Sequence, residues 1–151
     1  MPRLLIVHHS PTPAVQSVTD AVVAGATDEA IVGVDVVVRP ALEATIDDVL
    51  AADGYVLGTT ANFGYMSGAL KHFFDTVYDH VREETAKRPF GLYVHGRSDT
   101  FGAERSVLSI TTGLGWEQAT DVLAFLGEPS DNHLERAAEL GGTLAALLMP
   151  T

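Results

Sequence analysis

Five runs of apolar residues recur along the chain, and they constrain its fold more than any other feature. They cover residues 3–9, 34–40, 54–60, 89–96 and 119–125. These runs lack the polar alternation of a half-exposed strand, so they predict strands buried on both faces, as in a parallel sheet. Parallel neighbours need a long crossover connection, which is usually a helix.

The segments between the runs have the apolar spacing of helices. Stripes at i, i+3, i+4 and i+7 lie within residues 15–22, 66–81 and 134–148, and residues 103–114 are predicted as a further helix. The sequence TIDD, which begins at Thr45, is typical of a capping box that opens a short helix. Asp131 is predicted as the N-cap of the last helix.

The alternation predicts an α/β fold. We expect a doubly wound, five-stranded parallel sheet of order 2-1-3-4-5 between two helical layers. One domain over residues 1–151 is expected, because no linker interrupts the pattern. Ligands of such folds bind beyond the carboxyl ends of the strands, where the strand order reverses. Three loops meet there: the first (residues 9–14), the second (60–67) and the third (96–102).

Composition narrows the function classes. Acidic residues outnumber basic ones by 20 to 9, giving a formal charge of −11, so nucleic acid and membrane surfaces are not expected partners. The chain has no cysteine, which excludes disulfides, thiolate chemistry and cysteine-based metal sites. The apolar run at residues 4–7 is too short for a signal peptide or a membrane span, so a cytoplasmic location is expected.

The first loop offers hydroxyl groups to an anion. Ser10 and Thr12 precede Pro13, and proline is favoured at the first position of a helix. Thr12 would then be the N-cap, with the amides of Ala14 and Val15 facing the space before the helix. A helix start with hydroxyl groups can bind an anion without Lys or Arg. Simple capping would by itself explain Thr12 and Pro13, and for this loop taken alone it is the favoured explanation.

The second loop places two aromatic residues on a surface. Phe63 and Tyr65 flank Gly64, which would suit a turn with positive φ, and Ser67 can cap the following helix. Capping and turn formation do not explain the aromatics, which suit a flat ligand or a partner surface. The third loop has two hydroxyl groups and follows the fourth predicted strand, at the same edge of the sheet.

The sequence gives little support to a metal site, a hydrolase or a dinucleotide-binding fingerprint. His8 and His9 are adjacent, so a strand would direct them to opposite faces, and no helical His pair has metal-ligand spacing. No G-x-S-x-G elbow indicates a hydrolase. The sequence GLGWEQ, from Gly113, follows a helix instead of a strand and lacks the last glycine of a dinucleotide fingerprint. No metal ligand and no catalytic side chain is predicted.

The segment 58–79, GTTANFGYMSGALKHFFDTVYD, resembles flavodoxin-like NAD(P)H-dependent FMN reductases and WrbA-type quinone reductases. In those families a threonine and then F-G-N-M-S-G precede a helix with K-x-F-x-D. The matching residues are Thr60, Phe63, Gly64, Met66, Ser67, Gly68, Lys71, Phe74 and Asp75. The order and spacing of the other elements agree over essentially the whole chain.

The resemblance implies an FMN site formed by the three loops. Its residues would be Ser10, Thr12, Pro13, Ala14, Val15, Ala61, Asn62, Phe63, Gly64, Gly96, Arg97, Ser98 and Thr100. The first loop would hold the phosphate, and the other two would lie along the two sides of the isoalloxazine. Pro11 and Pro13 each lack an amide donor, so a weaker hold on the phosphate than in the family is expected.

The resemblance also implies an enzyme. It would take hydride from NAD(P)H onto FMN and pass the electrons to a quinone-like acceptor, with the flavin doing the chemistry. The related reductases assemble with flavins near subunit boundaries, and Tyr65, Phe101 and Trp116 are expected at the exposed rim, so a homodimer or larger oligomer is expected. The alternative is a flavodoxin-type one-electron carrier, which the acidic charge favours.

Overall fold

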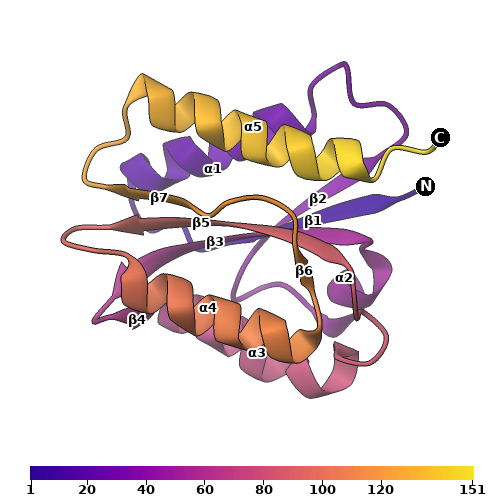
Figure 1. Ribbon diagram of the computed structural model, residues 1–151, viewed down its shortest axis with the longest axis horizontal. Helices are drawn as coiled ribbons and strands as arrows, with labels where there is room; N and C mark the ends of the chain where they lie inside the picture. The colour runs from indigo at the N-terminus through magenta and orange to yellow at the C-terminus, as the bar shows by residue number, and fades with distance from the viewer.

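The chain forms one twisted sheet between two layers of helices (Figure 1). A computed structural model describes residues 1–151. Its strands are β1 (Arg3–His8), β2 (Asp35–Pro40), β3 (Gly54–Asn62), β4 (Tyr65–Met66), β5 (Pro89–Gly96), β6 (Glu117–Gln118) and β7 (Leu123–Leu126). They follow the order β2-β1-β3-β5, with β6 and β7 both paired to β5, and all of these pairs are parallel. The predicted α/β fold and its strand order are confirmed.

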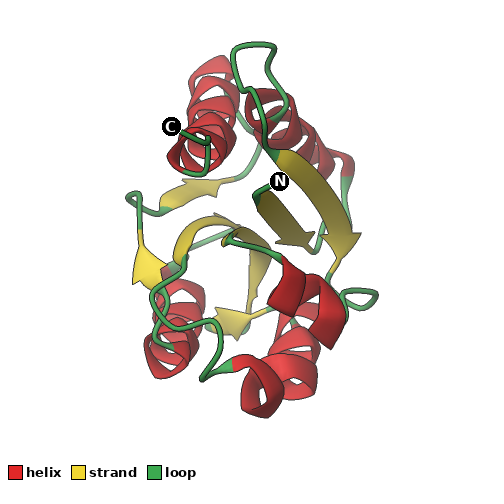
Figure 2. Cartoon of the chain, turned by 90° about the vertical axis from the view of Figure 1, so that its right-hand side faces the viewer, coloured by secondary structure: helices red, strands yellow, loops and turns green.

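Helices cover both faces of this sheet (Figure 2). They are α1 (Pro13–Ala26), α2 (Ile46–Ala51), α3 (Gly68–Val81), α4 (Phe101–Leu114) and α5 (Asp131–Leu147). The pair α1 and α5 packs on one face, and α2, α3 and α4 pack on the other (Figure 1). None of these helices combines the length and the apolar composition that a membrane span requires.

Burial on both faces explains the continuous apolar runs. In β1, Leu4 and Ile6 belong to the core under α1 and α5, whereas Leu5 and Val7 belong to the core over α3 and α4. All four side chains are fully buried. Successive side chains of a strand point to opposite faces, so a strand between two helical layers needs apolar residues at every position.

Capping residues set where the helices begin. The capping box at Thr45 is confirmed, and Thr12 and Ser67 cap α1 and α3 through their hydroxyl groups. The prediction of Asp131 as the cap of α5 was wrong. Ser130 is the N-cap: its hydroxyl accepts from the His133 amide, and its own amide donates to His133 Nδ1. Asp131 instead occupies the first turn, where a carboxylate complements the helix dipole.

The predicted fifth strand, residues 119–125, was wrong in its extent. Two short strands share that position, with β6 beside the start of β5 and β7 beside its end. The Ala119 amide still donates to the Phe90 carbonyl, and the chain then leaves the ladder at Thr120 and Asp121. This polar pair interrupts the apolar run, so the ladder resumes only at Leu123.

Trp116 is not at the rim, contrary to expectation. It is 5% exposed, and its ring stacks on Tyr55 with centroids 3.9 Å apart and planes at 8°. Its Nε1–H donates to the Thr85 hydroxyl over 2.8 Å. Tyr65 and Phe101 are exposed as expected. The turn between α4 and β6 thus places an aromatic side chain in the core and not at an interface.

Replacing this anchor should strongly destabilise the fold. Trp116→Ala should lower the free energy of unfolding by about 3–5 kcal/mol, because it leaves a cavity beside Tyr55. Leu147→Ala, a control truncation at an apolar side chain that is 57% exposed, should cost within about 0.5 kcal/mol. Urea unfolding of the two variants measures the difference. Similar costs for both would contradict the structural role of Trp116.

Candidate functional site

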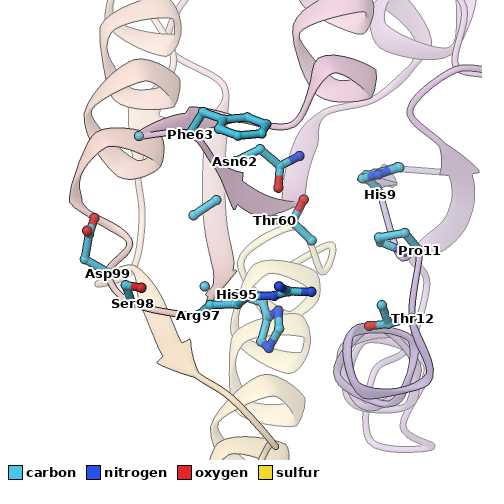
Figure 3. Close-up of a pocket in the computed structure, with 13 residues that line it drawn as sticks. His9, Pro11, Thr12, Thr60, Asn62, Phe63, His95, Arg97, Ser98 and Asp99 are labelled. Carbon is cyan, nitrogen blue, oxygen red and sulfur yellow. The ribbon is translucent and has the colours of Figure 1, made fainter.

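A pocket opens where the carboxyl ends of β1, β3 and β5 meet (Figure 3). Its volume is about 750 Å³, which lies within the range of about 300–1,000 Å³ for small-molecule sites. The three loops form it as predicted. Its lining residues are His9, Pro11, Thr12, Thr60, Ala61, Asn62, Phe63, Gly64, His95, Gly96, Arg97, Ser98 and Asp99.

Eight of the thirteen predicted site residues line this pocket. They are Thr12, Ala61, Asn62, Phe63, Gly64, Gly96, Arg97 and Ser98. Ser10, Pro13, Ala14, Val15 and Thr100 do not line it. The Val15 side chain is buried and the Thr100 hydroxyl donates to Glu104 Oε2 over 2.6 Å, so neither side chain faces the pocket. Their roles in holding a ligand stay predictions.

Five lining residues were missed by the sequence analysis: His9, Pro11, Thr60, His95 and Asp99. His9, Pro11, Thr60 and Asp99 fall within the three loops, so the loop ranges alone could have found them. His95 lies inside β5, where the apolar run gave no sign of an accessible side chain. Its Nε2–H donates to the Gly127 carbonyl over 2.8 Å, which fixes the ring at the end of the strand.

The second loop is a tight hairpin with backbone strain. β3 pairs antiparallel with β4, and the two residues at its tip, Phe63 and Gly64, have φ of 53° and 73°. Two consecutive positive φ angles match the type I′ turn, in which an aromatic is unfavourable. Phe63 is nevertheless fully exposed, with its ring at the edge of the pocket (Figure 3). Strain of this kind concentrates at functional sites.

The start of α4 fixes this hairpin in place. Gly102 lies so close that a Cβ there would be 1.9 Å from the Gly64 carbonyl oxygen. The Met66 amide donates to the Ser106 hydroxyl over 3.1 Å, one turn further along the helix. Because only glycine permits the close approach at position 102, the hairpin and α4 form one rigid unit that carries Phe63 to the pocket.

The first loop has few free donors. Pro11 and Pro13 have no amide hydrogen. The Val15 amide donates to the Thr12 hydroxyl over 3.4 Å, and the His9 amide donates to the Gly58 carbonyl over 3.0 Å. The prediction that Thr12 caps the helix is therefore correct, because its hydroxyl accepts the Val15 amide. The remaining unbonded amides of this loop belong to Ser10, Thr12 and Ala14.

The Ser10 hydroxyl belongs to a chain of hydrogen bonds that runs inward. Its oxygen lies 2.8 Å from His8 Nδ1 and 2.7 Å from Thr19 Oγ1, and Thr19 Oγ1 lies 2.7 Å from the Tyr93 hydroxyl. If Tyr93 donates to Thr19, Thr19 to Ser10 and Ser10 to His8, every hydroxyl proton has an acceptor. The opposite direction leaves the buried Tyr93 proton without one, which costs free energy. The first direction is favoured, with a neutral His8.

Burial shifts the pKa values of titratable groups in and beside this chain of hydrogen bonds. It lowers the pKa of His8, the neighbouring His9 lowers it further, and Asp20 opposes both. Burial also lowers the pKa of His9. For Tyr93, burial raises the pKa, so its hydroxyl stays protonated and available to donate. Desolvation disfavours the charged form in each case. The ring of Tyr93 is held tightly, since a Cβ on its neighbour Gly58 would be 2.1 Å from it.

One lining side chain has a polar atom without a partner. Thr60 is 8% exposed, and its hydroxyl oxygen is buried with no hydrogen bond. A buried polar group usually has a partner, so this unpaired hydroxyl in the pocket wall is a candidate partner for a polar ligand. Two charged side chains line the pocket, the guanidinium of Arg97 and the carboxylate of Asp99. No three His, Asp or Glu residues lie close enough together to hold a metal ion.

Comparisons with known proteins agree with this geometry. Residues 15–128 match the sequence profile of the family described as NADPH-dependent FMN reductase. A flavodoxin of Aquifex aeolicus (strain VF5) is 34% identical over 77 residues, which cover 51% of this chain and 40% of that protein. The match thus spans less than half of that relative's length.

Solved structures show the same fold. A flavodoxin from the domain Archaea superimposes with a TM-score of 0.82 at 17% identity, covering 97% of this chain and 98% of that one. A flavodoxin, WrbA-like protein from Agrobacterium tumefaciens gives a TM-score of 0.76 at 19% identity, with 98% of each chain covered. The predicted flavodoxin-like fold is therefore confirmed.

The hydrogen-bond chain predicts how stability depends on pH. The pKa of His8 is lower in the folded than in the unfolded chain, so the unfolded state binds more protons once pH falls below about 6.5. The free energy of unfolding should decrease as pH falls through that value. His8→Asn keeps an oxygen acceptor for Ser10 and cannot be protonated, so this decrease should become smaller, with His9 retaining a share.

Urea unfolding between pH 5 and pH 8 measures this effect. His72→Asn, a matched change at an exposed position of α3, should keep the wild-type pH dependence. The same pH dependence in His8→Asn as in wild type would show that the neutral His8 is not required by the chain of hydroxyl groups.

Proposed function

Because the chain belongs to the NADPH-dependent FMN reductase family, we propose that it binds FMN in this pocket and acts as an NAD(P)H-dependent oxidoreductase. The electrons would pass to a quinone or a similar small acceptor. The proposal includes no metal, nucleic acid or membrane partner. A cytoplasmic location stays a prediction from the sequence.

The observation that carries the proposal is the position of the pocket. It lies at the reversal of strand order, between β1 and β3, where flavodoxin-like folds take their ligands. The residues present fit FMN: the orphan hydroxyl of Thr60 offers a partner to a polar group, and the N-terminus of α1 offers unbonded amides to a phosphate. Bound flavin would supply the electron transfer, and the protein would supply orientation and electrostatics.

The second loop favours a reductase over a carrier. A hydride donor must lay its nicotinamide on an open face of the flavin at near-attack distance. Nothing lies within 4 Å of the position of a Cβ on Gly64, and Phe63 projects into solvent. The open space beside the hairpin leaves room for a second planar ring. The formal charge of −11 and the flavodoxin relative keep the one-electron carrier as the second candidate.

We also propose that the protein forms a homodimer or larger oligomer through three rim aromatics, Phe63, Tyr65 and Phe101. Their exposed fractions are 107%, 42% and 75%. The close contact between Gly102 and Gly64 brings the start of α4 beside the hairpin, so the three side chains gather at one edge. Exposed aromatics that gather at one edge are typical of an interface.

Light scattering at micromolar concentration, with FMN present, tests this assembly. The wild type should have at least twice the mass of the 16.0 kDa chain. Replacing Tyr65 and Phe101 together by serine should shift it toward the monomer, because the interface would lose its apolar anchors. Leu147→Ser, at an exposed apolar position at the end of α5, should leave the mass unchanged. A monomeric wild type would refute the proposal.

Anaerobic reduction separates the two functions. With FMN bound, NADH or NADPH should bleach the visible absorbance of the flavin within seconds, and a quinone should restore it. Free FMN with the same nucleotide is the control and should bleach far more slowly. If neither nucleotide reduces the bound flavin, whereas a separate reductase protein does, the carrier function is correct.

A backbone variant extends this test to the hairpin. Gly64→Val should slow the bleaching, since a branched residue is strained at a φ of 73° and would intrude on the open space. Gly33→Val carries similar strain, at a φ of 77° in the loop before β2, and should leave the bleaching rate unchanged.

A further inference from the structure

The basic side chains of this acidic protein are few, and several are already engaged. Arg3 pairs with Asp35, Arg39 with Asp48, and Lys71 with Asp75. The Arg88 guanidinium donates to backbone carbonyls between α2 and β3. Arg97 is different: it lines the pocket, is exposed, and has no ion pair or hydrogen bond. A free guanidinium in the wall of a pocket is available to an anionic ligand.

The direction of this side chain limits which part of a ligand it can reach. Figure 3 shows Arg97 extending across the pocket toward Pro11 and Thr12 of the first loop. Asp99 lies on the opposite side of the third loop and points away from that gap (Figure 3). The nearest carboxylate in the sequence therefore does not neutralise Arg97, and its charge faces the start of α1.

The first loop offers a phosphate dianion backbone amides but no charged side chain and no free hydroxyl group. Two of its residues are prolines, the Thr12 hydroxyl accepts from the Val15 amide, and the Ser10 hydroxyl is held by His8 and Thr19. Three amides and the helix dipole are left, with no side-chain cation on the loop itself. A guanidinium from the facing loop would supply the missing charge. Arginine suits this task, because its fork of donors matches two phosphate oxygens at once.

We propose that Arg97 binds the phosphate group of the bound flavin nucleotide, across the pocket from the N-terminus of α1. It thereby makes the site select FMN over the unphosphorylated riboflavin. This inference rests on the proposed binding of FMN and gives Arg97 a different role from the ring contact implied by the sequence resemblance. The phosphate would be held between two loops, and the third loop would be tied to the first only when the ligand is present.

Titration of the flavin-free protein with FMN and with riboflavin, followed by quenching of flavin fluorescence, tests the proposal. Arg97→Gln should weaken FMN binding by about tenfold or more and riboflavin binding by less than about twofold. Arg97→Lys keeps the charge and should recover part of the loss. The salt dependence of FMN binding should also become smaller in Arg97→Gln, since one charged contact is gone.

Arg105→Gln is the matched control. Arg105 is exposed on α4, lies outside the pocket and has no ion pair, so the variant has the same change in charge and should bind both flavins like wild type. Equal losses for the two flavins in Arg97→Gln, or no loss for either, would overturn the role of Arg97 alone. A wild type that binds neither flavin would overturn the FMN proposal together with this inference.

Discussion

The requirement to bury both faces of the central strands determines where the site can be. β1 is apolar from Leu4 to Val7, and the threonine and amide side chains of β3 gather at its carboxyl end, from Thr59 to Asn62, because α1 and α5 cover one face of the sheet and α3 and α4 the other. Polar chemistry can therefore appear only where the strands end. In a parallel sheet those ends lie at one edge, and the reversal of strand order between β1 and β3 leaves a gap between the helices that follow them. Thr12, Thr60 and Arg97 reach one pocket for this reason.

Close packing then turns these loops into a defined site. Gly102 lets α4 touch the backbone of the second loop, and this contact holds the hairpin in place although the backbone of Phe63 is strained. On the other side, the hydrogen bonds from His8 through Ser10 and Thr19 to Tyr93 tie the first loop to the core. In the third loop, the Arg97 side chain makes no hydrogen bond or ion pair that would fix it to the core. The first and second loops thus form two rigid walls of the pocket, and the third loop faces them with the unpaired guanidinium of Arg97.

The periodicity of the sequence predicted the layers, the strand order and the three loops, because strands that are buried on both faces have continuous runs of apolar residues. It did not predict directions of side chains within the loops. Ser10 has the residue type of a phosphate ligand, yet its hydroxyl turns inward because Thr19 and Tyr93 offer it buried partners. Trp116 follows a glycine-rich turn that reads as surface, yet it stacks on Tyr55. Such outcomes depend on residues far apart in the chain, which no local pattern encodes.

The contact between Gly58 and Tyr93 limits how this chain can change in evolution. The two residues face each other across β3 and β5, and the tyrosine ring occupies the space that a side chain at position 58 would need. A larger residue at 58 would displace the ring and leave the Thr19 hydroxyl without its buried partner. A smaller residue at 93 would leave a void above the glycine. Substitutions at positions 19, 58 and 93 should therefore be accepted together or not at all, so the three positions should covary among relatives that keep this core.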